Sequence, residues 1–321
     1  SDVCSSDLEG TKFYKRHGYY YLSIPEGGVG EGWQTILRSK NIYGPYEKKV
    51  VLEQGNTTVN GPHQGALVDT PEGEWWFFHF QLTEPLGRVV HLQPVCWMEN
   101  WPVIGVDMDM NGIGEPVKVW TKPGVSKSVL VSHPQTTDDF NSYTLGLQWQ
   151  FNHNPVNTHW SLNERRGWLA LKALKAATLR ESRNMLTQKC MGYLSTATVL
   201  LDFSALADGQ RGGLFCTGSL YNGIGISREE GKNYLYLEKN GDVQQVKMVS
   251  GKKIYLRVML DAKKNRCQLF YSFDNRNFIL CGDAYSLKFG DWKGARVGLY
   301  SYNTLGIGGK CYFDWFNYDF N

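Results

Sequence analysis

The chain has 321 residues, which is more than one hydrophobic core usually spans, so its length predicts two domains. Its 42% hydrophobic residues and mean hydropathy of -0.38 are typical of a globular chain with sizeable cores, and no apolar run reaches the length of a transmembrane helix. The formal charge of +3 is nearly balanced, and no basic stripe alternates with aromatic residues, which argues against nucleic acid as a partner.

The first eight residues, SDVCSSDL, have an unusual origin. The end of a common sequencing-library adapter encodes this same octapeptide when it is translated in one frame. We therefore expect residues 1–8, with Cys4, to be an artefact that marks a truncation of the gene, and fold reasoning begins at Glu9. The alternative is a genuine polar tail, which an uninterrupted natural reading frame encoding the octapeptide would establish.

Residues 9–121 have the pattern of short strands separated by turns. The strand-like runs are rich in aromatic and β-branched residues and lie at residues 18–24, 35–39, 65–70, 74–80 and 88–97. The segment from Asp69 to Gly73 is a turn signal, so the strands around Ala66 and Trp76 are predicted to form a hairpin. Short strands at such regular spacing indicate a sandwich, a barrel or a propeller.

A linker is predicted at residues 122–137, where prolines and scattered polar residues interrupt the strand pattern. Strand-like runs then resume, and residues 138–321 are predicted to form an antiparallel β-sandwich. Asn240-Gly241 is a strong two-residue hairpin signal within it. The stretch 168–182 has high helix propensity, but its start alternates apolar and other residues, so we expect a strand that runs into a loop.

The seven cysteines lie at positions 4, 96, 190, 216, 267, 281 and 311. None of them forms a CxxC pair, which argues against a zinc site. Their wide scatter is typical of buried thiols, and one or two disulfides remain an alternative in an oxidising compartment.

Four ordered segments resemble glycoside hydrolase family 43. They are EGTKFYKRHGYYYL at residues 9–22, PEGGVGEGWQTILRSKNIYGPYE at 25–47, GPHQGALVDTPEGEWWFFHF at 61–80 and GRVVHLQPVCW at 87–97. The second half also resembles the concanavalin-like sandwich of many members, and it ends in VGLYSYN and FDWFNYDF. The resemblance implies an all-β fold: the last blades of a five-bladed β-propeller over residues 9–121, followed by a concanavalin-like antiparallel β-sandwich.

The resemblance implies that Glu9 is the catalytic general acid. Sugar acetals need a proton on the departing oxygen, and members of this family invert configuration with a Glu acid and an Asp base. A third carboxylate, another Asp, tunes the acid, and both Asp residues lie on earlier blades. Only residues 1–8, the expected artefact, precede Glu9 here, so no earlier blade supplies the two Asp residues and we expect this chain by itself to be inactive. Thr11 stands where most relatives carry Pro, which leaves the subfamily open.

Four further positions match family sites around the propeller channel. His63 matches an imidazole directed toward a channel cation, typically calcium that is reached partly through water. Arg88 matches an arginine whose guanidinium contacts sugar hydroxyls near the cleaved bond. Trp33 and Gln34, after the Gly-Gly loop, are expected to line the same pocket, with blade packing as the alternative for Trp33.

The segment Asp107–Gly112, DMDMNG, imitates a calcium-binding loop. Its twelfth position is Lys118, where such loops carry a bidentate Glu, so we expect a polar turn.

Together these features predict the C-terminal part of a glycosidase that removes α-L-arabinofuranosyl or β-D-xylosyl groups from plant cell-wall glycans such as arabinoxylan, arabinan or xylo-oligosaccharides. The two sugars share a hydroxyl layout, so the sequence leaves the choice open. The alternatives are a non-catalytic, lectin-like carbohydrate-binding protein and a purely structural sandwich. No cofactor is expected for the chemistry, and the resemblance implies a periplasmic or secreted parent.

Overall fold

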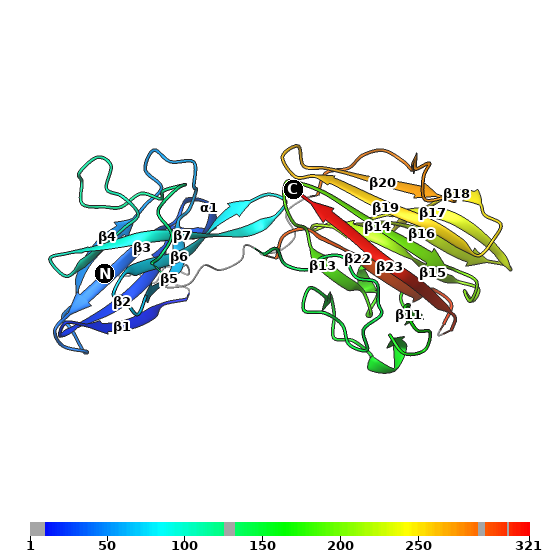
Figure 1. Cartoon of the computed structure of the whole chain (residues 1–321), viewed down its shortest axis with the longest axis horizontal. Coiled ribbons are helices and arrows are strands. Elements are labelled where there is room, and N and C mark those ends of the chain that lie inside the picture. Colours follow the sequence, from blue (N-terminus) through cyan, green and yellow to red (C-terminus); the bar gives the residue numbers. More distant parts are fainter. Residues whose placement is uncertain (1–9, 125–131, 288–292, 307) are drawn as a thin grey trace. The chain divides into compact units, whose positions relative to one another are not determined.

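The computed structural model describes residues 10–124, 132–287, 293–306 and 308–321, and it is built almost wholly of strands. The chain divides into two compact units (Figure 1). The first contains residues up to Thr83 and Arg88–Val131, and the second contains Glu84–Gly87 and Ser132–Asn321. The all-β fold predicted from the sequence is therefore confirmed.

Two four-stranded antiparallel sheets make up the first unit, each with its strands in sequence order. The first sheet contains β1 (Lys12–Arg16), β2 (Tyr19–Glu26), β3 (Trp33–Ser39) and β4 (Glu47–Leu52). The second contains β5 (His63–Asp69), β6 (Trp75–Thr83), β7 (Gly87–Met98) and β8 (Trp101–Ile104). One short helical turn, α1 (Gly28–Glu31), joins β2 to β3. Up-and-down sheets of four strands are the units from which propellers are built.

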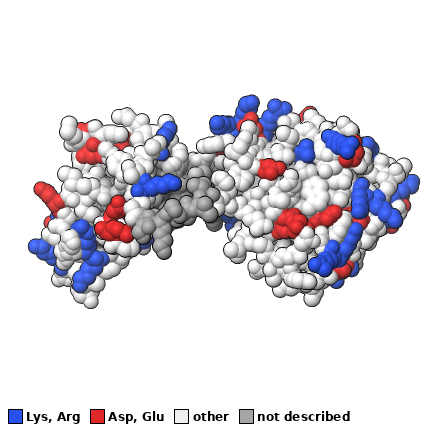
Figure 2. Space-filling view, viewed as in Figure 1, with Lys and Arg blue, Asp and Glu red and all other residues white. Residues whose placement is uncertain are grey.

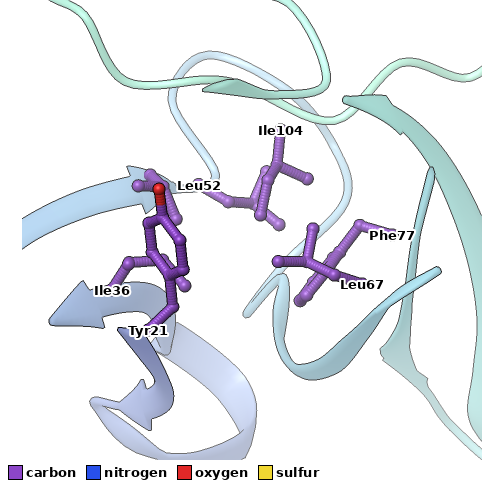
Figure 3. Packing of buried hydrophobic residues seen from close by; sticks show 7 residues of the cluster. Tyr21, Ile36, Leu52, Leu67, Phe77 and Ile104 are labelled. Carbon is purple, nitrogen blue, oxygen red and sulfur yellow. The ribbon is translucent and has the colours of Figure 1, made fainter. Parts of the chain in front are cut away.

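An apolar cluster joins these two sheets face to face. Tyr21 and Ile36 of the first sheet and Phe77 of the second are fully buried in it (Figure 3). The remaining buried members are Val51, Leu52, Leu67 and Ile104. The innermost strands also meet, since the Leu67 N–H donates to the Tyr14 hydroxyl at 3.0 Å.

The second unit is a sandwich of two sheets. One sheet has the strand order β10-β11-β23-β14-β19-β20-β21, and the other has β18-β17-β16-β15-β22-β13-β9 with β12 added beside β22. The short strands are β9 (Gln150–Phe151), β10 (Trp160–Ser161), β11 (Leu169–Lys172), β12 (Leu174–Lys175), β13 (Leu186–Lys189) and β21 (Ile279–Leu280). The longer ones are β14 (Leu194–Asp202), β15 (Gln210–Thr217), β16 (Tyr221–Glu229), β17 (Lys232–Lys239), β18 (Asp242–Met248), β19 (Lys253–Asp261), β20 (Arg266–Ser272), β22 (Arg296–Asn303) and β23 (Lys310–Phe320).

Three local predictions can be checked directly. The hairpin of β5 and β6 turns at residues 70–74, as expected. Asn240 and Gly241 connect β17 to β18, and both have positive φ, of 50° and 97°, which is the requirement that favours this dipeptide in two-residue turns. The stretch from residue 168 forms β11 and β12 and then a single 3-10 turn at Leu179–Glu181, so the strand-then-loop prediction is also confirmed.

The cysteines within the described residues are all free thiols. Five are buried and Cys96 is exposed, while Cys4 lies outside the described residues. The nearest pair is Cys190 and Cys216, whose sulfur atoms lie 3.8 Å apart in the sandwich core. Burial and the neighbouring thiol groups raise the pKa of Cys216, so it stays protonated and unreactive.

No helix in the part of the chain that the structure describes is long and apolar enough to cross a membrane. Acidic and basic side chains are interspersed over the visible face of the second unit (Figure 2).

Candidate active site

His63, Phe80 and Arg88 come together where β5, β6 and β7 lie side by side in the first unit. His63 begins β5 and pairs directly with Phe80 of β6. Their rings lie 5.5 Å apart, and the Arg88 guanidinium carbon lies 4.5 Å from the centroid of the Phe80 ring. The imidazole and the guanidinium therefore share one aromatic neighbour, although the sequence separates them by 25 positions (88 − 63). The sequence reasoning did not single out Phe80.

The His63 ring is oriented by the turn that precedes it. Its Nδ1–H donates to the Gly61 carbonyl at 2.8 Å, which fixes the orientation of the ring. A Cβ atom at Gly32 would lie only 2.8 Å from His63 Cδ2, and one at Gly61 would lie 2.3 Å from the carbonyl oxygen of Val29. Glycine is therefore required at both positions, because the loop around α1 packs tightly against the turn that holds the imidazole.

Gln34 approaches the same region from β3. Its side chain is buried, and its Nε2 donates to the Ser23 hydroxyl at 2.9 Å. Its Oε1 accepts a longer hydrogen bond of 3.4 Å from the Gly65 N–H, two residues after His63. Both side-chain polar atoms are used within the protein, so Gln34 ties the two sheets together beside the imidazole.

Trp33 points to the opposite face of β3 from Gln34, as neighbouring residues of a strand do. Its indole N–H donates to Glu26 Oε2 at 3.2 Å, and Glu26 also accepts from Lys48 at 2.8 Å and from the Thr35 hydroxyl. Burial would raise the pKa of Glu26, but the hydrogen bonds from Lys48 and Thr35 outweigh it and hold the pKa below its usual value. Glu26 is therefore an ionised anchor for the Trp33 ring.

Arg88 carries a buried donor that the described residues leave unsatisfied. Its Nε has no hydrogen-bond partner among them, and the same is true of Asn60 Oδ1, which lies in the turn before His63. Leaving a buried polar group unpaired costs about 1–3 kcal/mol, so native proteins seldom keep one without a use.

A buried pair of histidines lies on β6 and β7. The rings of His79 and His91 stack at 5.3 Å. His79 Nδ1–H donates to the Phe80 carbonyl at 3.1 Å, and its Nε2 accepts from the Gln93 amide at 3.2 Å. Burial, together with the nearby His91 and His63, lowers the pKa of His79 to about 4, although the hydrogen bond to Phe80 opposes the shift. A neutral ring therefore packs directly behind the Phe80 backbone. Sequence patterns left the role of His79 open, because only burial fixes its charge.

Protonation of His79 is expected to destabilise the first unit in acid. The folded pKa lies near 4 against about 6.5 for an exposed ring, so the stabilisation is complete above pH 6.5 and is lost as the pH falls toward 4. The loss amounts to about 3 kcal/mol at the acidic end. Chemical denaturation between these pH values measures it, and NMR titration of the ring gives the pKa directly.

His79→Gln is the matched variant, because an amide can still accept from Gln93 without gaining a charge. The free energy of unfolding of this variant should fall less in acid than that of the unchanged chain, by the amount that protonation of His79 costs. An NMR pKa near 6.5 for His79 would contradict the prediction.

Glu9 itself lies outside the described residues, so its role as the acid stays a prediction. The next residue, Gly10, is described, and a Cβ atom there would lie 3.4 Å from the Gln64 side chain. Gln64 follows His63 directly in the chain, so Gly10 lies close to the strand that carries the imidazole.

The described residues do not by themselves form a metal site. No group of three or more His, Cys, Asp or Glu side chains among them is placed to hold an ion. Calcium prefers six to eight oxygen ligands, and His63 offers one nitrogen, so channel calcium stays a prediction and no chemical step is assigned to it. In the segment Asp107–Gly112, the Asp107 carboxylate accepts from the backbone N–H groups of Asn111 and Gly112 at 3.1 and 2.8 Å, as in a polar turn.

Comparison with known families and proteins gives consistent matches. The family model described as glycosyl hydrolases family 43 matches residues 6–102, and the model described as beta xylosidase C-terminal concanavalin A-like domain matches residues 137–319. A putative beta-xylosidase of Xylanibacter ruminicola is 53% identical over 90% of this chain and 54% of its own length. A non-reducing end alpha-L-arabinofuranosidase of Bacteroides ovatus is 31% identical over 78% of this chain and 47% of its own length. The chain thus spans about half the length of these curated relatives.

Solved structures give the same picture. A GH43 protein from Bacillus licheniformis matches 99% of this chain and 66% of its own, with 27% identity and a TM-score of 0.85. A bifunctional GH43-CE protein of Bacteroides eggerthii matches 97% of this chain and 40% of its own, with 29% identity and a TM-score of 0.82.

Proposed function

The chain belongs to glycosyl hydrolase family 43 and carries that family's C-terminal concanavalin A-like domain, and from this premise we propose that it is the C-terminal part of an inverting glycosidase. Its substrates are glycans with terminal β-D-xylosyl or α-L-arabinofuranosyl groups. Relatives named for each of these two activities support both sugars.

The observation that carries the proposal is the convergence of His63 and Arg88 on Phe80, with Gly10 close by. His63 and Arg88 lie at the starts of β5 and β7, and Gly10 precedes β1 of the adjacent sheet. A propeller gathers the inner strands and loops of its blades around one channel. The planar guanidinium of Arg88, with its several N–H donors, supports a role in holding sugar hydroxyls.

In this proposal Glu9 protonates the departing glycosidic oxygen. A carboxylate base on the opposite side of the sugar ring deprotonates the attacking water, and we assign that base to residues outside this chain. Arg88 holds the sugar through its guanidinium donors, while His63 and Gln34 keep the inner ends of the two sheets in register. The same pocket without a base would make a carbohydrate-binding protein, which is the second candidate.

The purified 321-residue chain is expected to show no turnover of aryl β-D-xylosides or aryl α-L-arabinofuranosides, because it lacks the base. A chimera would supply the carboxylate base. In it, the part of the Xylanibacter relative that precedes the matched region is joined to residues 9–321. This chimera is expected to hydrolyse at least one of the two substrates with inversion, which NMR of the first-formed sugar anomer reports.

Two results would contradict the proposal. Turnover by the chain alone that Glu9→Gln abolishes would place a base within these residues. A folded chimera that binds xylo-oligosaccharides and hydrolyses neither substrate would favour the carbohydrate-binding candidate.

A further inference from the structure

The outer face of the seven-stranded sheet in the sandwich carries a row of polar and aromatic side chains. Thr198 of β14 pairs with Asn317 of β23 and with Arg257 of β19, so these three side chains lie on one face. The residues beside them in sequence, Val199, Leu256 and Phe316, are fully buried in the core. Because side chains alternate across a strand, the Thr198 row faces away from the core.

Trp315 lies on this outer face. Its ring packs against Tyr255 of β19 at 6.0 Å with an interplanar angle of 34°, and the residues on either side of Tyr255 are fully buried. Trp315 is half-buried. A ring that is fixed by a neighbour and stays partly exposed is a suitable platform for a ligand.

A cavity of about 350 Å³ opens beside Trp315. Apart from Trp315 its lining is polar and comes from three separate parts of the second unit: Thr137, Asp138, Asp139, Asn275 and Asn317. The volume falls within the range of small-ligand sites, which combine an apolar surface with a few placed polar groups.

Two walls of this cavity are held rigidly. The Asp138 carboxylate accepts from the Phe140 N–H at 2.8 Å and from the Trp149 indole at 2.7 Å, so it is used internally. On the other side, the Asp274 carboxylate accepts from the backbone N–H groups of the next turn residues at 2.8 Å, which fixes the loop that carries Asn275. Because these walls are ordered before binding, less conformational entropy is lost when a ligand binds.

The polar groups that remain available are mixed donors and acceptors. The Asn275 side-chain amide has no hydrogen-bond partner in the described part of the chain and offers both functions. Asp139 accepts from Asn141 at 3.1 and 2.7 Å, and its exposed carboxylate keeps further lone pairs for a ligand. Hydrogen bonds from Asn141 lower the pKa of Asp139, so its carboxylate is ionised and repels anionic ligands.

We propose that this cavity is a second carbohydrate site, in which a neutral pyranose or furanose ring of a glycan stacks on Trp315 and its hydroxyls bond to Asn275, Asp139 and the indole N–H. An aromatic face matches the apolar C–H face of a sugar ring, and the remaining groups match hydroxyls, which both donate and accept. The site holds no acid–base pair across a bound ring, so it binds glycan without cleaving it. The choice of xylan-type ligands rests on the proposed function, but the site itself does not depend on catalysis.

Binding of xylohexaose and of soluble arabinoxylan to the whole chain tests this site, by isothermal titration and by affinity electrophoresis. Trp315→Ala is expected to weaken binding by about ten-fold, the equivalent of about 1.4 kcal/mol. Trp315→Phe keeps an aromatic ring but lacks the indole donor, so its affinity should lie between those of the unchanged chain and Trp315→Ala. Asn275→Ala should weaken binding several-fold. Tyr193→Ala, which removes another exposed ring of the same unit, is the matched control and should bind as the unchanged chain does.

Two outcomes would overturn the proposal. One is wild-type affinity in a Trp315→Ala variant whose unfolding temperature is unchanged. Another is the absence of saturable binding by xylo- or arabino-oligosaccharides up to about 10 mM. Because these tests measure binding and involve no hydrolysis, a negative result in them is distinguishable from a chimera that lacks activity.

Discussion

In the active chimera, Glu9→Gln is expected to lower kcat/KM for a poor leaving group, such as an unsubstituted phenyl glycoside, by about 10²–10⁴-fold. An alkoxide or weakly acidic phenoxide leaves slowly unless it is protonated as the bond breaks, and the amide of Gln cannot supply that proton. The loss should appear in kcat, because ground-state binding of the sugar does not use the acidic proton.

The leaving group provides the internal control. A dinitrophenyl glycoside departs without protonation, so the same variant should retain most of its activity on that substrate. Glu72→Gln is the matched variant, since Glu72 is an exposed carboxylate in the turn between β5 and β6 and has no role in the site. A uniform loss on both substrates would show that Glu9 supports structure or binding and is not the acid.

Phe316→Ala is expected to destabilise the sandwich by about 3–5 kcal/mol. Phe316 is fully buried on β23, and its ring meets Trp149 edge-on at 5.0 Å. Removing the ring leaves a cavity that the surrounding strands cannot close, because both sheets hold their spacing through continuous hydrogen-bonded ladders. At about 2–4 °C per kcal/mol for a domain of this size, the unfolding temperature should fall by roughly 10 °C.

Differential scanning calorimetry of the whole chain measures this fall. Phe273→Ala is the control, because Phe273 is 49% exposed in the same unit and its removal should cost less than about 1 kcal/mol. Equal losses for the two variants would mean that the packing around Phe316 does not stabilise the sandwich.

Strands and tight turns follow from short-range pattern, which is why the sequence predicted them well. Asn240 and Gly241 adopt positive φ at low cost in any context, so the hairpin of β17 and β18 is a local property. The run from residue 168 also follows a local pattern, but there the helix competes with the strand. High helix propensity favoured a helix there, but pairing of Leu169 with Phe313 of β23 formed a strand.

The register of β5 and β6 at the candidate site could not be predicted from short-range sequence pattern. Counting back along the β5–β6 hairpin from the pair Asp69–Trp75, whose numbers sum to 144, would place Gln81 opposite His63. The structure pairs His63 with Phe80, because an irregularity at Gln64, with φ of 56°, inserts an extra residue into β5. This shift puts an aromatic ring between the imidazole and Arg88.

The roles of Glu9, His63 and Arg88 stay predictions. The sequence by itself determined the all-β character, the two-part organisation, the main hairpins and, through its ordered motifs, the family. These depend on residues close together in the chain, where turn geometry and side-chain alternation act. Only the tertiary structure decided that Phe80 joins His63 to Arg88, that burial keeps His79 neutral, and that residues 137–139, Asn275 and Trp315 enclose one cavity. The physical reason is that register shifts, desolvation and cavities are created by segments distant in sequence, and no local pattern encodes which of them will meet.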